Sequence, residues 1–133
     1  MTRINCIPPS ELCRQHLVAE YRELPRVVTL AKGACLRGLT PETLLAPPAY
    51  TLGRGHVLFF YARLGFIVQR FHELVAEMDD RGYIARIRPF ALCAGLETFP
   101  GRQWLCEWKP TPEAQALNRA RIAERLSTNT QGA

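Results

Sequence analysis

Apolar positions recur at helical spacing most clearly between His56 and about Arg81. Six large apolar residues follow one another there at three- and four-residue intervals. Charged residues of this stretch, Arg70 among them, fall mostly off the apolar stripe, and Gly82 is placed to end the helix. The pattern predicts a long amphipathic helix whose buried stripe is Phe60, Leu64, Ile67, Phe71, Leu74 and Met78.

A second helical pattern lies near the start of the chain. It predicts a helix from about Glu11 past Leu24, with Ser10 as the N-cap residue. Pro25 lacks a backbone N–H and should kink or restart the helix, which then continues to about Ala31. The apolar side of this helix consists of Leu17, Tyr21, Leu24 and Val28.

The last helix is expected from about Pro112 to Leu126, with Thr111 as its cap. Residues 33–55 contain several glycines and prolines and are expected to form a connection. Residues 83–110 are irregular as well. A short alternation at 84–88 is stopped by Pro89, so short strands in this region stay an alternative.

These elements predict an all-α fold of about three helices with long irregular connections. The chain has 133 residues, of which 47% are hydrophobic, enough for a core without a metal or disulfide. We therefore expect one compact domain over residues 1–133, with a polar tail from about residue 127. No apolar stretch approaches the length of a membrane span.

The charge balance is basic, +5 at pH 7, and it comes from arginine because only Lys32 and Lys109 are lysines. A modest basic excess is compatible with nucleic acid, but many ordinary domains share it. The five cysteines form no Cys-x-x-Cys pair, so we expect small buried thiols, no bound metal and no cofactor. Their odd number and a polar start without a signal peptide indicate a reducing, cytoplasmic setting. The cysteines are Cys6, Cys13, Cys35, Cys93 and Cys106.

The polar side of the first helix carries a carboxylate, Glu23, close to Arg22 and Arg26. In the simplest interpretation this side is only a solvated face. A lone anion in a basic patch repels phosphate, however, and suits a site where positive charge develops during a reaction. The polar side comprises Gln15, His16, Arg22, Glu23 and Arg26.

Three blocks of sequence resemble one known family. The first and most specific block is Met1-Thr2-Arg3-Ile4-Asn5, then Ser10-Glu11-Leu12, Gln15-His16-Leu17 and Ala19 to Val27. The second is Leu52-Gly53-x-Gly55-His56-Val57-x-Phe59-Phe60-Tyr61, and the third, weaker one is Ala120-Arg121-Ile122-x-Glu124-Arg125. Together they resemble the pyrimidine-dimer DNA glycosylase/AP lyase of bacteriophage, a compact all-α enzyme also called endonuclease V.

The resemblance implies an enzyme that excises a base at a cyclobutane pyrimidine dimer in double-stranded DNA and then cuts the strand by β-elimination. Met1 is removed, and the amine of Thr2 attacks C1′ of the sugar to form an imine. Glu23 matches the catalytic carboxylate. The base opposite the lesion is flipped out of the duplex. Residues matching phosphate contacts are Arg3, Gln15, His16, Arg22 and Arg26, and Arg121 and Arg125 match basic positions on the last helix.

A terminal amine suits this chemistry better than a lysine does. With a pKa of about 7.7, an α-amino group is roughly 15–20% neutral at pH 7, against about 0.04% for a lysine side chain. The two lysines also lie outside every matched block, and Arg3 and Arg22 should lower the amine pKa further.

Two alternatives remain open, a non-catalytic helical DNA-binding module and a glycosylase/lyase for another base lesion; a small adaptor protein explains less. The family's aromatic, basic tail is replaced here by Ser127 to Ala133, without an aromatic or charged residue. Base stacking must then come from elsewhere, and Arg102, Trp104 and Trp108 are the candidates, although core packing suits the two tryptophans better. We expect a monomer that acts in a bacterial or phage-infected cell.

Overall fold

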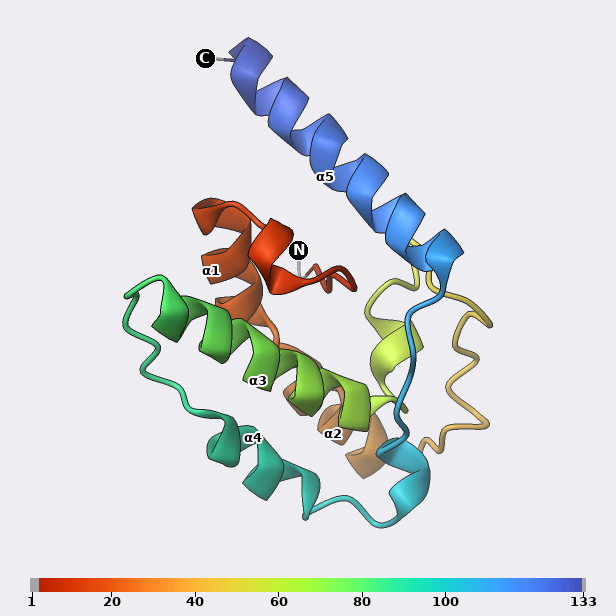
Figure 1. Cartoon of the computed structure of the whole chain (residues 1–133). Coiled ribbons are helices and arrows are strands. Elements are labelled where there is room, and N and C mark those ends of the chain that lie inside the picture. Colours follow the sequence, from red (N-terminus) through yellow and green to blue (C-terminus); the bar gives the residue numbers. More distant parts are fainter. Residues whose placement is uncertain (1–2, 133) are drawn as a thin grey trace.

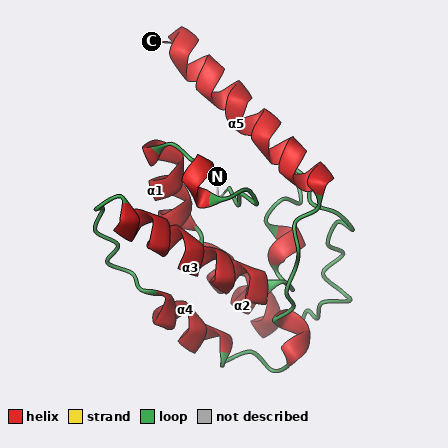
Figure 2. Ribbon diagram, viewed as in Figure 1, coloured by secondary structure: helices red, strands yellow, loops and turns green. Residues whose placement is uncertain are grey.

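The computed structural model describes residues 3–132 and, of their side chains, those of residues 3–127. Within this range every regular element is a helix (Figure 2). The single β-bridge among the described residues pairs Arg63 with Leu105. The predicted all-α fold is therefore confirmed. The helices number five rather than three: α1 (Arg14–Glu23), α2 (Pro25–Leu36), α3 (Leu64–Asp80), α4 (Pro89–Leu96) and α5 (Pro112–Gly132), with short 3-10 helices at Pro9–Glu11, Leu58–Phe60 and Arg102–Trp104.

Helix α3 carries five of the six residues of the predicted apolar stripe, and Phe60 lies in the 3-10 helix before it; all six are buried. Two details of the prediction were wrong. The helix begins at Leu64 rather than His56, because residues 53–63 form tight turns and the 3-10 helix at Leu58–Phe60. Arg70 lies inside the core, with 3% of its surface exposed. Gly82 ends the helix as expected, with a positive φ of 80° that glycine adopts without strain.

The first predicted helix is in fact two. Ser10 does not cap it, since Pro9–Glu11 form a separate 3-10 turn, and α1 starts only at Arg14. The break at Pro25 is confirmed, because α2 begins there. Leu24 between the helices keeps helical backbone angles, so α2 continues the path of α1.

Helix α4 was not predicted, because Pro89 was taken to stop the chain's regular structure. Proline occupies the first position of this helix, where its missing N–H leaves no hydrogen bond unmade. Helix α5 starts at Pro112, and the hydroxyl of Thr111 accepts a hydrogen bond from the N–H of Ala114 at 3.0 Å, as a cap should. It continues to Gly132, past the predicted end at Leu126.

Helix α3 runs through the middle of the molecule, with α4 on one side and α5 on the other (Figure 1). The N-terminal segment, residues 3–8, enters between α5 and the layer of α1 and α3, and hydrogen bonds tie it to both. Trp104 is buried against Phe99, and Trp108 stacks on Tyr50. Trp104 thus belongs to the core and offers no stacking platform for bases, while Trp108 is half-buried against the core and keeps part of its surface exposed.

Candidate active site beside the N-terminal segment

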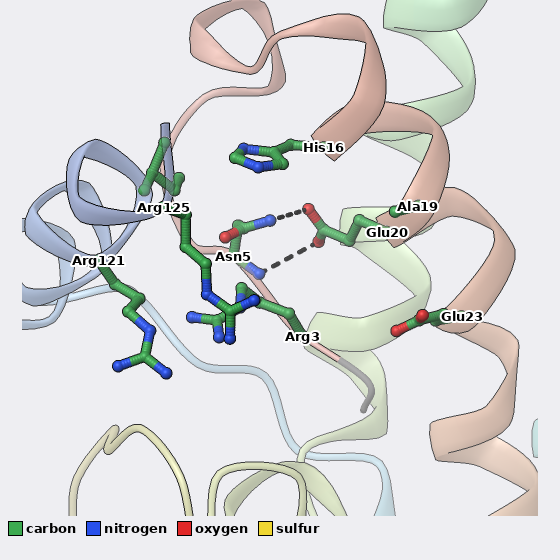
Figure 3. Close-up of a pocket in the computed structure, with 9 residues that line it drawn as sticks. Arg3, Asn5, His16, Ala19, Glu20, Glu23, Arg121 and Arg125 are labelled. Atoms are coloured by element: carbon green, nitrogen blue, oxygen red, sulfur yellow. Dashed lines mark hydrogen bonds between the residues drawn. The ribbon is translucent and has the colours of Figure 1, made fainter. Parts of the chain in front are cut away.

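A cavity of about 150 Å³ opens where the N-terminal segment meets α1 and α5 (Figure 3). Three elements distant in sequence contribute to its wall, and most of the lining side chains are polar or charged. The lining residues are Arg3, Asn5, His16, Ala19, Glu20, Glu23, Arg121, Ile122 and Arg125.

A buried polar network fixes the floor of this cavity. The Glu20 carboxylate accepts hydrogen bonds from Arg70 Nε at 2.8 Å and from Arg70 Nη2 at 3.0 Å, and both side chains are almost fully buried. Glu20 also accepts from the Asn5 side chain at 2.7 Å and from its backbone N–H at 3.3 Å. A buried ion pair needs such extra hydrogen bonds to offset the desolvation of both charges.

Asn118 of α5 completes the network from the other side. Its Nδ2 donates to Asn5 Oδ1 at 2.8 Å, and its Oδ1 accepts from the backbone N–H of Cys6 at 2.7 Å. The N-terminal segment has no β-strand neighbour to take its backbone hydrogen bonds, so these side chains satisfy them instead. The result is a segment held between two helices at a defined depth.

Three nitrogen atoms around the cavity are buried without a hydrogen-bond partner among the described residues. They are Nη1 of Arg3, Nδ1 of His16 and Nε of Arg121. Such groups are costly to leave unsatisfied, and in a polar cavity they indicate a site built for a ligand, here one that accepts hydrogen bonds. Burial lowers the pKa of Arg3, and the nearby cations Arg125 and Arg121 lower it further. A bound anion would relieve this repulsion between like charges.

His16 lies beside this arginine group. Burial lowers the pKa of His16, and the positive charges of Arg3 and Arg125 add to the effect. The ring is therefore kept neutral near pH 7 and can accept or donate a single hydrogen bond to a ligand.

Glu23 faces the arginine group from α1, as Figure 3 shows. It is half-buried and lines the cavity, and none of the described residues forms a hydrogen bond or ion pair with it. A carboxylate in this state is available to a ligand. It is the negative end of a site whose other wall carries Arg3, Arg121 and Arg125.

The structure brings together five of the nine residues expected at the site, namely Arg3, His16, Glu23, Arg121 and Arg125. Gln15 and Arg22 are exposed and line a neighbouring depression with Arg14, Val18 and Ala19. Arg26 is exposed on the first turn of α2 and lines neither hollow. Glu23 therefore lies among arginines as expected, but those that share its cavity come from the N-terminal segment and α5.

Thr2, the expected nucleophile, lies outside the described residues. The first described residue after it is Arg3, whose side chain lines the cavity.

Sequence reasoning missed Asn5, Glu20, Arg70 and Asn118. A signal was present, because three of these polar residues fall on apolar stripes. Glu20 shares the buried side of α1 with Leu17 and Tyr21, and Asn118 lies between Ala114 and Ile122 at four-residue spacing. A charge on a buried stripe demands a buried partner, and Arg70 on α3 is such a charge of opposite sign.

The described part of the chain also bears on the expectations for metal binding, membrane-spanning helices and cysteines. Residues 3–132 contain no group of three or more His, Cys, Asp or Glu placed to hold a metal ion, and no helix among them is long and apolar enough to cross a membrane. The cysteines are free thiols, but the expectation that all are buried was wrong: only Cys6 is, while Cys13, Cys93 and Cys106 are exposed.

Comparison with known protein families identifies a match. The family described as pyrimidine dimer DNA glycosylase matches residues 1–87, about two thirds of the chain. The matched range contains Arg3, His16 and Glu23 of the cavity, together with Glu20 and Arg70 of the network beneath it. Arg121 and Arg125 on α5 lie outside the matched range. This match confirms the family indicated by the sequence blocks: the chain belongs to the pyrimidine dimer DNA glycosylase family.

Proposed function

We propose that this protein excises a base at cyclobutane pyrimidine dimers in double-stranded DNA and cuts the damaged strand, using the amine of Thr2 after removal of Met1. The family supports DNA glycosylase activity in general. The observation that carries the finer proposal is the polarity of the cavity. The carboxylate of Glu23, which no described residue binds, faces an arginine group with nitrogens that lack partners among the described residues, beside the N-terminal segment.

In the proposed reaction the neutral Thr2 amine attacks C1′ of the sugar, and the C1′–N bond to the base breaks. The base leaves with that electron pair and takes up a proton. Loss of the amine protons and opening of the sugar ring give an imine between Thr2 and C1′. Positive charge grows at C1′ as the base departs, and the fixed carboxylate of Glu23 stabilises it.

Strand cleavage follows from the same intermediate. A base removes a proton from C2′, the electrons form a C2′–C3′ double bond, and the 3′ phosphate leaves. Glu23, which lines the cavity, is the proton acceptor in this proposal. Hydrolysis of the remaining imine then frees the amine.

The arginines have a different task in this scheme. Arg3, Arg121 and Arg125 bind the phosphates that flank the damaged nucleotide, and the unsatisfied nitrogens of Arg3 and Arg121 provide donors for them. Gln15, Arg22 and Arg26 extend the contact along the outer surface of α1 and the start of α2. Charged contacts of this kind position the duplex rather than read its sequence.

Borohydride trapping tests this proposal. Processed protein incubated with a duplex that contains an abasic site should form a covalent adduct on reduction, and peptide mapping should place it on the Thr2 amine. Protein that retains Met1 is the matched control and should be nearly inactive, since a displacement of about 1 Å can already cost about a hundredfold.

Three other outcomes would be informative. An adduct on Lys32 or Lys109 would show that the nucleophile is wrong. Binding to DNA with neither adduct nor nicks would favour a non-catalytic binding module. Nicks at abasic sites without any at UV-induced dimers would move the substrate to another base lesion.

A further inference from the structure

Ile4, two residues after Thr2 in the sequence, has both of its backbone polar groups held by side chains. Its N–H donates to Nε2 of His56 at 2.8 Å, and its carbonyl accepts a hydrogen bond from the hydroxyl of Tyr50 at 2.9 Å. All three residues are buried, and the partners come from a connection about fifty residues further along the chain. We call Tyr50 and His56 the Ile4 clamp.

The second hydrogen bond of His56 defines its protonation state. Nδ1 lies 2.8 Å from the carbonyl oxygen of Thr51, which can only accept, so Nδ1 carries the proton. Nε2 is then bare and accepts from Ile4. Burial lowers the pKa of His56, so the neutral ring that this arrangement needs is the favoured form.

A glycine turn brings His56 to this position. Gly53 and Gly55 both have positive φ angles, 70° and 88°, and a Cβ on Gly55 would lie 3.1 Å from Pro47 Cγ. The turn folds the chain back so that the His56 ring reaches the carbonyl of Thr51. The ring also packs edge-on against Tyr50 and Phe60. Packing on two sides and two hydrogen bonds leave the imidazole one orientation.

The clamp differs in purpose from the network around Glu20. That network holds Asn5 and Cys6 and contains the ion pair on which the core depends. The Ile4 clamp consists of uncharged groups and holds the two peptide groups on either side of Ile4, directly after Arg3 in the chain. A terminal nucleophile has rotational freedom on every residue beyond its last fixed point, so the position of that point sets the volume the amine samples.

We propose that Tyr50 and His56 are positioning residues for the N-terminal nucleophile, fixing the peptide of Ile4 so that the amine two residues earlier meets the substrate sugar opposite Glu23. This inference rests on the proposed function, since it presupposes attack by the Thr2 amine. It gives a task to the Gly-x-Gly-His block, which contributes no residue to the cavity wall.

The test compares the rate of covalent trapping with the affinity for DNA. Tyr50→Phe removes only the hydroxyl that binds the Ile4 carbonyl. We expect its single-turnover rate of borohydride trapping on abasic duplex to fall at least about tenfold, with the Kd for that duplex changed less than about twofold. A residue that only supported the fold would not separate these two quantities.

His56 offers a rescue by design. The amide oxygen of a glutamine lies near the position of Nε2, whereas the shorter amide of an asparagine replaces Nδ1 and cannot reach Ile4. We therefore expect His56→Asn to lose trapping about as strongly as Tyr50→Phe, and His56→Gln to recover a large part of it. The reverse order would overturn the proposal.

Two control variants separate positioning from stability. Tyr61→Phe removes a half-buried phenol hydroxyl that makes no hydrogen bond among the described residues, and it should trap at the normal rate. Ile67→Val loosens the core on α3 and leaves both clamp side chains unchanged. If it lowers trapping as much as a clamp variant of equal Tm, the clamp is only structural.

The two proposals fail in different ways. If the wild-type protein forms no adduct, or forms it on a lysine, the proposed function is wrong and the clamp has no nucleophile to position. If the wild-type adduct is on Thr2 but both Tyr50→Phe and His56→Asn trap at the normal rate, only the clamp inference is overturned.

Discussion

Glu20 and Glu23 line the same cavity from one helix, and Arg70 binds the carboxylate of Glu20 but not that of Glu23. The difference divides their tasks, because Glu20 is committed to the core while Glu23 is available to a ligand. The same Glu→Gln substitution, made at two positions three residues apart, is therefore expected to lower stability in one case and activity in the other.

Glu20→Gln should destabilise the fold. It leaves Arg70 as a buried charge without its counter-ion, and breaking a buried pair in this way costs about 3–5 kcal/mol. Urea denaturation should show the loss as a lower free energy of unfolding. An unchanged free energy would mean that Arg70 finds another acceptor and that the ion pair does not hold the N-terminal segment in place.

Glu23→Gln should leave stability within about 0.5 kcal/mol, as for surface substitutions without a special role. It should abolish excision at dimers while DNA binding is retained or improved, since removing a negative charge cannot weaken attraction to phosphate. Nicking of UV-irradiated duplex and a filter-binding Kd measure the two effects. Near-normal cleavage by this variant would reduce Glu23 to a surface acid.

The arginines can be compared through the salt dependence of binding. Each lost phosphate contact lowers the slope of log K against log salt by about 0.9. We expect that reduction for Arg22→Ala, Arg26→Ala, Arg121→Ala and Arg125→Ala.

Arg119→Ala is the matched control for these variants. It lies on α5 like Arg121 and Arg125, but its guanidinium is held by Glu11 through bonds of 2.8 and 2.9 Å. Its slope should stay at the wild-type value. Equal slopes for Arg119→Ala and Arg121→Ala would place the DNA surface away from the cavity.

Stability should fall on mild acidification. Burial lowers the pKa of both His56 and His16 below the ordinary 6.5, and the charge of Arg3 adds to both effects. Arg125 lowers the pKa of His16 further, whereas the hydrogen bond to the Thr51 carbonyl and the charge of Glu20 partly oppose the shift of His56. Between 6.5 and the lower folded pKa values the unfolded chain binds more protons than the folded one, so unfolding becomes easier as pH decreases.

Urea denaturation at about pH 7.5 and about pH 5.5 measures this loss. The window stays above the range in which Glu11 and Asp79 titrate, whose pKa values their arginine partners lower. In His56→Gln the difference between the two pH values should shrink. If the difference in the free energy of unfolding between the two pH values is the same in this variant as in the wild type, His56 does not contribute to the pH dependence of stability.

The helices that pack on the core could be predicted from the sequence, because their buried apolar residues recur at three- and four-residue spacing. The stripe on α3 and the break at Pro25 both follow from local rules. Helix α4 could not be predicted in this way, because a proline such as Pro89 can either stop regular structure or occupy the first position of a helix. Only the packing of this segment on α2 and α3 shows that it is helical. The start of α1 was misplaced for a similar reason, because Pro9–Glu11 close a separate turn.

The site was predictable only where resemblance supplied the residues. Nothing local in the sequence places Arg121 and Arg125 beside Arg3, because Asn118 must first anchor α5 on the N-terminal segment. The Ile4 clamp was hidden as well: His56 stands in one of the resembling blocks, but nothing local shows that both of its nitrogens form hydrogen bonds inside the protein. Long-range hydrogen bonds between a side chain and the backbone produce no repeating sequence pattern from which they could be predicted.

The last prediction concerns the end of the chain, where Ser127 to Ala133 carry no aromatic and no charged side chain. Base stacking is worth about 1–3 kcal/mol per base, and this segment cannot supply it. Helix α5 is anchored upstream by Ala114, Asn118 and Ile122, so deleting 127–133 should change dimer cleavage by less than about threefold, or about 0.65 kcal/mol. A deletion that starts at Arg125 is the control and should cost more, because it removes a cavity arginine. With Trp104 buried in the core and Trp108 stacked on Tyr50, we also expect robust cleavage of abasic sites but lower selectivity for dimers over undamaged duplex. A large loss on the shorter deletion would instead make the polar end part of the site.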